Sequence, residues 1–200
     1  NRDEVVRYLT ADEIDLAVMG RAPQEVRVKS VSFADNPTAF LSAPSHVLMN
    51  TSGLNLEMLA NAHMLVREKG SGARASLERI FKNAGLKLSV GAELSSNESI
   101  KQLCIAGLGP AYMSLQSCLL EIRAGLLCVL PLANNPMNRR WNVVHLEHKP
   151  LSQVASVFMD YLIRHGQTQV EEQLAMMSKL PVAEAVVLHS NPTEPEQPSP

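Results

Sequence analysis

A strand, a turn and a helix follow one another within residues 63–83, and this stretch constrains the fold more than any other. The apolar run 64–66 predicts a buried strand, and the glycine-containing segment 70–72 predicts a turn. The next residues have the spacing of an amphipathic helix whose core face carries Leu77, Ile80 and Phe81. Because the first N–H groups of such a helix point beyond the strand, they can bind an anion or a polar group.

Similar patterns predict further elements on both sides of this stretch. Apolar or alternating runs predict strands over residues 14–19, 26–31, 88–94, 107–112, 126–130 and 141–147. Helical spacing predicts helices over residues 1–9, 56–59, 95–104, 116–123, 151–166 and 169–180. Asn1 and Glu4 have the spacing of a capping box at the start of the first helix. Gly166 is expected to end the helix over residues 151–166.

The alternation of strands and helices predicts an α/β fold of two Rossmann-like lobes, each with a parallel sheet, joined by two crossover strands. We expect residues 1–45 and 149–166 to form lobe I and residues 46–148 to form lobe II. The parallel sheet of lobe I needs further members, which we expect before Asn1. Residues 167–200 are expected to be a C-terminal extension, disordered after about residue 190, where proline alternates with polar and acidic residues.

The composition argues against several classes of partner. The formal net charge of −2 gives no overall basic surface for nucleic acid. No apolar run reaches the roughly 18 residues of a membrane span, so no membrane partner is expected. The three cysteines have apolar neighbours, which predicts buried, reduced thiols and a cytoplasmic location.

No residue pattern predicts catalysis or a metal site. The motifs GxSxG and GxxxxGK[ST] are absent. His145 and His148 would lie on opposite faces of a strand, and the other histidines lack clustered Cys, Asp or Glu partners. We therefore expect that the protein is not an enzyme and holds no catalytic residue, metal or cofactor.

The turn over residues 70–75, GSGARA, leaves three interpretations open. It matches the dinucleotide pattern GxGxxG/A, and Glu93 ends the next strand where a ribose-binding acid would lie. However, Arg67–Lys69 separate the turn from its strand, and Arg74 would crowd a pyrophosphate. The turn can also be purely structural. The interpretation we favour is a small anionic ligand at the helix N-terminus.

Polar residues at the ends of other predicted strands can share this site. The run 95–98 has capping-box spacing between its ends, which leaves Ser96 and Asn97 available to a ligand. Gly20 and Arg21 end a predicted strand of lobe I. Arg21 is therefore either an exposed surface residue or a residue whose guanidinium makes a bidentate contact with a carboxylate or phosphate.

Several motifs in this order resemble the effector-binding domain of LysR-type transcriptional regulators across most of residues 1–166. They are DLAVMGR (15–21), FLSAPSHVL (40–48), LVREKGSGARASLERIF (65–81), ELSSNESIKQLCIAGLGPAYMS (93–114) and RRWNVVHLE (139–147). The runs SSNESIKQ, GLGPAYMS and RRWNVVH are most similar to the CbbR branch, which controls carbon-fixation operons of the Calvin cycle.

The resemblance implies a fold like that of type 2 periplasmic solute-binding proteins, with a small metabolite bound between the lobes. It also implies a homotetramer that binds promoter DNA through an N-terminal winged helix-turn-helix outside this chain. For the CbbR branch, the implied effectors are phosphorylated sugars or acids such as ribulose bisphosphate or phosphoglycolate. Lys69 and Arg74 are further cations near the turn, with weaker claims than Arg21. The predicted effector-binding residues are Gly20, Arg21, Lys69, Gly70, Ser71, Gly72, Arg74, Ser96 and Asn97. The alternatives are a transport-type solute-binding protein of the same fold and, less favoured, an NAD(P)-binding enzyme.

Overall fold

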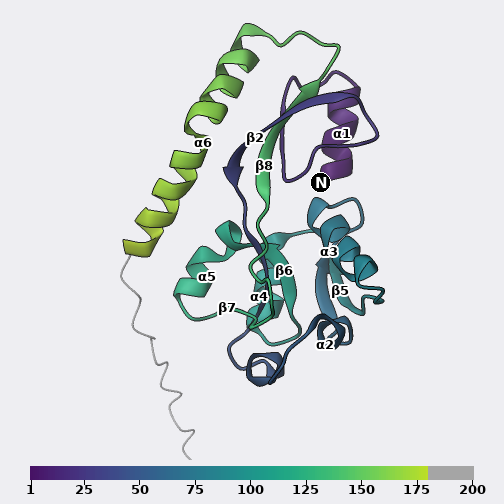
Figure 1. The fold of residues 1–200 in the computed structure, drawn as a ribbon, viewed down its shortest axis with the longest axis vertical. Coiled ribbons are helices and arrows are strands. Elements are labelled where there is room, and N and C mark those ends of the chain that lie inside the picture. Colours follow the sequence, from purple (N-terminus) through teal and green to yellow (C-terminus); the bar gives the residue numbers. More distant parts are fainter. Residues whose placement is uncertain (180–200) are drawn as a thin grey trace, which may run out of the picture.

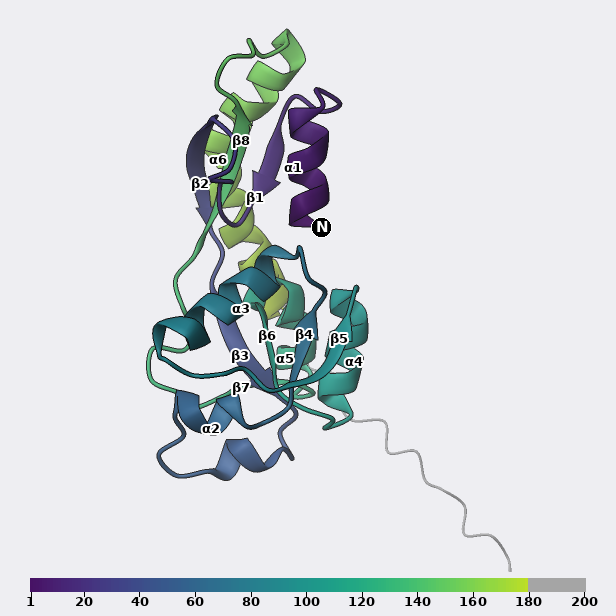
Figure 2. The ribbon, with the colours of Figure 1, turned by 90° about the vertical axis from the view of Figure 1, so that its right-hand side faces the viewer.

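The chain folds into two α/β lobes, and the polypeptide passes between them twice (Figures 1 and 2). The structure is a computed structural model that describes residues 1–179. The disorder predicted after about residue 190 therefore concerns residues outside the described part. Within residues 1–179, no helix is both long enough and apolar enough to cross a membrane.

Lobe I is built on a three-stranded antiparallel sheet with the strand order β1-β8-β2. These strands are β1 (Ala17–Met19), β8 (Arg140–Leu146) and β2 (Val28–Asp35). Helix α1 (Arg2–Thr10) packs on one face of the sheet with Val144, and helix α6 (Gln153–Lys179) packs on the other with Val143. The predicted capping box of Asn1 and Glu4 is confirmed at the start of α1.

The parallel sheet expected in lobe I is wrong for the strand pairs that the structure describes. β2 leads into lobe II and β8 returns from it, so the two strands run in opposite directions. β1 is also antiparallel to β8 and therefore runs towards lobe II. This direction delivers Gly20 and Arg21 to the junction between the lobes.

Lobe II contains a five-stranded mixed sheet with the order β5-β4-β6-β3-β7. Its strands are β3 (Thr38–Ser42), β4 (Met64–Arg67), β5 (Val90–Leu94), β6 (Ala111–Ser114) and β7 (Cys128–Val129). β4 is parallel to β5 and β6, whereas β3 is antiparallel to β6 and β7. The predicted strand, turn and helix of residues 63–83 are β4 and α3 (Gly72–Asn83), so this prediction is confirmed.

Helices cover both faces of the sheet in lobe II because its strands alternate their apolar side chains between two cores. One core joins the strands to α3, α2 (Leu56–Ala60) and the 3-10 helix η1 (Val47–Asn50). The other joins them to α4 (Asn97–Ile105), the 3-10 helix η2 (Leu115–Cys118) and α5 (Leu119–Arg123). Along β4, Met64 and Val66 face α3 while Leu65 faces α4, which places the next residue, Arg67, on the α4 side.

The sheets divide the chain at different residues from the predicted boundaries. β3 lies within the range 1–45 expected in lobe I, yet it pairs in the sheet of lobe II. β8 lies within the range 46–148 expected in lobe II, yet it is the central strand of the sheet in lobe I. The chain therefore crosses just before Thr38 and again just before Arg140.

The cysteines lie mostly inside lobe II. Cys104 and Cys118 are buried, Cys128 is half-buried, and all three thiols are free. Burial raises the pKa of Cys104 to about 12 and also raises the pKa of Cys118. Both buried thiols are therefore protonated at neutral pH and act as small apolar groups in the core of α4 and η2.

Helix α6 continues through Gly166, where the sequence predicted its end and a second helix over residues 169–180. Gly166 is buried against Phe33 of β2, and a Cβ at this position would lie 2.3 Å from Cδ2 of the phenyl ring. Gln167, the next residue, bonds to the backbone N–H of Asp35 at the end of β2 (2.8 Å). The absence of a Cβ at Gly166 therefore allows helix α6 to pack closely against the sheet of lobe I.

We expect Gly166→Ala to lower the stability of the chain. In an ordinary helix interior this change gains about 0.5–1 kcal/mol, whereas the overlap with Phe33 should cost about 1–3 kcal/mol. Urea unfolding followed by circular dichroism measures the difference. In the Phe33→Ala background the same change should become stabilising, because the ring has gone. A stabilising Gly166→Ala in the wild-type background would contradict this packing account.

Candidate functional site

A cavity of about 540 Å³ lies between the lobes, at the point where several elements begin or end. Lobe I contributes the start of α1 and the end of β1, and lobe II contributes the start of α3 and α4 and the end of β4 and β6. The residues before β3 and β8, on the two crossings, complete its wall. A position beyond the carboxyl ends of parallel strands is typical of ligand sites in α/β proteins.

The structure brings only part of the predicted site to this cavity. Five of the predicted residues line it: Gly20, Arg21, Ser71, Gly72 and Asn97. Four are not among the residues that line it: Lys69, Gly70, Arg74 and Ser96. The exposed guanidinium of Arg21 has no ion pair or hydrogen bond to another residue in the described part of the chain.

The start of α3 presents hydrogen-bond donors to the cavity. Ser71 is the N-cap, is 4% exposed, and makes no side-chain capping bond. Its carbonyl accepts from the N–H of Ala75, but the N–H groups of Gly72 and Ala73 find no acceptor among residues 1–179. These free donors, together with the helix dipole, favour a negatively charged group in front of them.

Arg139 contacts both lobes from the crossing that precedes β8. Its Nη1 donates to Oγ of Ser76 on α3, and its Nη2 donates to the carbonyl oxygen of Gly20 after β1 (3.4 Å). Both acceptors are neutral, and no carboxylate within residues 1–179 forms an ion pair with this guanidinium. Its positive charge is therefore not compensated inside the cavity.

Arg139 lies within the motif RRWNVVHLE but was not predicted as a site residue. Its position immediately before the strand that returns to lobe I was the available signal, because this part of the chain lies between the two lobes. Ser76 was missed because it lies one turn after the glycine-containing turn, in a segment that otherwise predicts a core helix face.

Two polar pairs, one buried and one partly buried, line the cavity. Thr38 Oγ1 and Tyr112 Oη are 2.6 Å apart, and Ser114 donates to Oδ1 of Asn36 at 2.6 Å. These residues come from the start of β3 and the end of β6, which are antiparallel neighbours. The pairs give the cavity neutral polar groups, which the apolar patterns used to predict the strands did not reveal.

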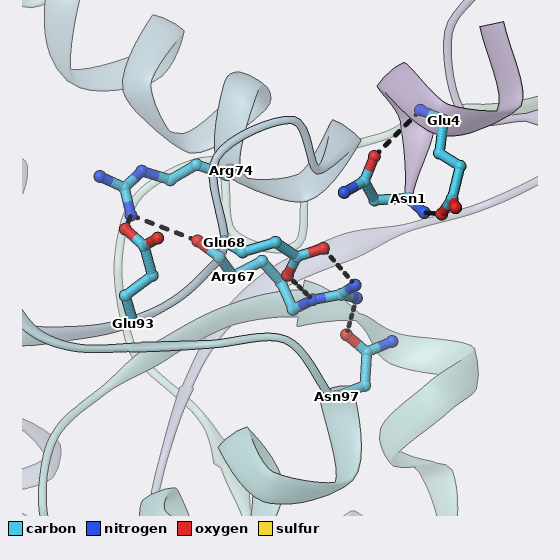
Figure 3. Close-up of polar contacts among 7 residues, drawn as sticks. All are labelled: Asn1, Glu4, Arg67, Glu68, Arg74, Glu93 and Asn97. Carbon is cyan, nitrogen blue, oxygen red and sulfur yellow. Dashed lines mark hydrogen bonds and ion pairs between the residues drawn. The ribbon is translucent and has the colours of Figure 1, made fainter. Parts of the chain in front are cut away.

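Arg67 also lines the cavity, but its charge is balanced by its neighbour (Figure 3). Nε and Nη2 of Arg67 donate to the two carboxylate oxygens of Glu68, at 2.8 and 3.1 Å. Nη1 donates to Oδ1 of Asn97 at 2.7 Å. The hydrogen bond from Arg67 is the main cause that lowers the pKa of Glu68, so its carboxylate is charged at neutral pH.

The predicted capping box over residues 95–98 does not form. Ser96 is the N-cap of α4 without a side-chain capping bond, and Glu98 pairs with Lys101 at 2.8 Å. Asn97, the first residue of the helix, holds Arg67. Ser96 itself is not among the residues that line the cavity.

Arg74 has a different role from the predicted ligand contact. It is 7% exposed and points away from the group formed by Arg67 and Asn97 in Figure 3. Its guanidinium donates to Glu78 at 2.6 Å, to Glu93 at 3.2 Å and to the carbonyl of Arg67 at 3.2 Å. Arg74 thus fixes the loop between β4 and α3, because it ties both ends of that loop to β5.

The neighbouring loop residues Lys69 and Gly70 do not line the cavity. Lys69 is exposed and has no partner among the described residues. Gly70 has φ +87°, and its carbonyl accepts from the N–H of Asp3 at 3.2 Å. This bond joins α1 of lobe I to the loop of lobe II.

No group of three His, Cys, Asp or Glu side chains in residues 1–179 is arranged to hold a metal ion.

Comparisons with known proteins agree with this architecture. The chain is 35% identical over 167 residues to the HTH-type transcriptional activator CmpR of Synechocystis sp., covering 84% of this chain and 55% of CmpR. It is 35% identical over 167 residues to the HTH-type transcriptional regulator CbbR of Sinorhizobium medicae, covering 83% and 53% of the two chains. The chain therefore spans about half the length of these curated relatives.

A similar solved structure is the CcmR regulatory domain of Synechocystis in complex with 2-PG. It aligns with a TM-score of 0.75 and 30% identity over 82% of this chain and 79% of that one, which confirms the predicted two-lobed α/β fold. The model of the LysR substrate binding domain matches residues 1–167. The chain therefore belongs to the family of LysR substrate-binding domains, a family of transcription regulators and not of enzymes.

Proposed function

We propose that the cavity between the lobes binds a small anionic metabolite and that this binding regulates transcription by the longer protein. The observation that carries the proposal is the uncompensated guanidinium of Arg139, which contacts both lobes beside the cavity. The free N–H groups of Gly72 and Ala73 line the same cavity. A cation and a helix N-terminus together are suited to a phosphate or carboxylate.

An anion at this position would alter the balance between lobe arrangements. Arg139 joins Ser76 of lobe II to Gly20 of lobe I, and Gly70 of lobe II accepts a backbone hydrogen bond from Asp3 of lobe I. A ligand that binds better when these groups are close together favours the closed arrangement over a more open one. The changed angle between lobes would then be transmitted to the assembly.

The relatives support a narrower proposal about the ligand and the genes. CmpR and CbbR are transcription regulators at 35% identity, and the related CcmR domain is in complex with 2-PG. We infer that the ligand is a phosphorylated acid or sugar of carbon metabolism and that the regulated genes serve carbon fixation. The proposal includes a cytoplasmic homotetramer that binds promoter DNA through a helix-turn-helix outside this chain.

Arg139→Gln should weaken the binding of phosphoglycolate by about 1.5–3 kcal/mol, the usual loss for a hydrogen bond to a charged group. Isothermal titration calorimetry on the 200-residue chain measures this change. Arg140→Gln is the matched control, because the adjacent arginine points to Asp35 of β2 (2.8 Å) and does not line the cavity. Equal losses in the two variants would contradict the role of Arg139.

A second pair of variants tests where the anion lies. Arg21 and Lys69 are both exposed cations without partners in the described structure, but only Arg21 lines the cavity. Arg21→Ala should therefore weaken binding of phosphoglycolate, by up to about 3 kcal/mol if its guanidinium contacts the ligand. Lys69→Ala should leave the affinity within twofold of the wild type. The reverse order of effects would place the ligand on the loop between β4 and α3.

A further inference from the structure

The wall of the cavity carries more positive charge than a single phosphate would balance. Glu25 is the one carboxylate among the lining residues that the structure describes. A phosphate group carries at most about two negative charges. The arginines that line the cavity come from both lobes and from the second crossing: Arg2, Arg21, Arg67, Arg79 and Arg139.

Two of these arginines already have carboxylate partners. Arg2 forms ion pairs with Asp3 at 3.0 Å and with Glu25 at 2.8 Å. Arg67 forms an ion pair with Glu68 at 2.8 Å. The lining arginines that have no carboxylate partner within residues 1–179, and whose charge is therefore available to a ligand, are Arg21, Arg79 and Arg139.

Arg139 connects the segments that carry the other two arginines. Its Nη2 donates to the carbonyl oxygen of Gly20 at 3.4 Å, and Arg21 is the next residue along the chain. Its Nη1 donates to Oγ of Ser76 on α3. Arg79 lies three residues after Ser76, which places both residues on one face of the helix, and both line the cavity. Three guanidinium groups without carboxylate partners therefore border the same part of the cavity.

Helix α3 offers two places for an anionic group along this wall. At its start lie the free N–H groups of Gly72 and Ala73, and the hydroxyl of Ser71, which is 4% exposed, makes no hydrogen bond to another residue within residues 1–179. The Cα of Arg79 lies about 10 Å further along the helix axis, at a rise of about 1.5 Å per residue. Because long side chains on a helix lean towards its N-terminus, the guanidinium of Arg79 is within reach of a group next to the one at the helix start.

We propose that Arg79 recognises a second anionic group of the ligand, while the first lies at the start of α3 beside Arg139. This inference rests on the proposed function and narrows its ligand class to molecules with two anionic groups on a short chain. A guanidinium binds a carboxylate or a phosphate through two parallel hydrogen bonds, so Arg79 suits either group. Arg21 lines the cavity from lobe I, so a ligand of this class would be held by cations of both lobes.

Two probes that differ at one end test the proposal. Phosphoglycolate and 2-hydroxyethyl phosphate share a phosphate on a two-carbon chain, but one ends in a carboxylate and the other in an alcohol. We expect the wild type to bind phosphoglycolate at least about tenfold more tightly, and Arg79→Gln to lower this preference about tenfold, the scale of one charge-assisted hydrogen bond. The ratio of the two dissociation constants cancels the effect of the variant on the shared phosphate. Calorimetric titration of the 200-residue chain measures both constants, with displacement of phosphoglycolate for the weaker probe.

Lys82→Gln is the matched control for the loss of one positive charge. Lys82 is exposed on the same helix, three residues after Arg79, and does not line the cavity. This variant should leave the preference within about twofold of the wild type, because exposed charges are screened by salt and solvent. Arg79 makes no ion pair or hydrogen bond within the described part of the chain, so Arg79→Gln should also leave the midpoint of thermal unfolding unchanged.

The outcomes distinguish this inference from the proposed function. If both probes bind and Arg79→Gln changes the preference by less than about twofold, the role of Arg79 is overturned and anion binding stands. If Lys82→Gln lowers the preference as much as Arg79→Gln does, the effect is one of net charge and the inference is again overturned. If neither probe binds to the wild type, the proposed function fails, and the inference fails with it.

Discussion

The two crossings between the lobes are the constraint on which the site depends. β2 must enter lobe II and β8 must return from it, so these strands are antiparallel and both cross at one place. β1 pairs with β8 and is thereby directed at the same junction. The end of β1, the start of α3 and the segment before β8 consequently meet around one cavity. The position of the cavity follows from the topology before any individual side chain is considered.

Local patterns predicted the elements well and their long-range pairing poorly. The strand, turn and helix of residues 63–83 depend on nearby residues, and the prediction was confirmed. The lobe boundaries depend on which distant strands pair, which alternation of apolar residues does not specify. Gly166 shows the same limit, because a glycine that ends a helix and a glycine that packs against a ring look alike in sequence.

Charge balance separates the site residues that sequence could not rank. The sequence alone does not distinguish the four arginines Arg21, Arg67, Arg74 and Arg139, but the fold gives each of them different surroundings. Arg74 is neutralised by Glu78 and Glu93 behind the loop, and Arg67 is neutralised by Glu68. Arg139 has only neutral acceptors. The anion site at the start of α3 stays a prediction from the sequence, while the cation best placed to serve it is visible only in the folded chain.

The central claim is that an anion binds between the start of α3 and Arg139. An amide NMR titration of the isotopically labelled chain with phosphoglycolate tests it most directly, because it reports on individual N–H groups. The account predicts that the backbone N–H signals of Gly72 and Ala73 and the Nε–H signal of Arg139 shift together and saturate at one ligand concentration. Saturable binding that leaves these three signals in place would contradict the account.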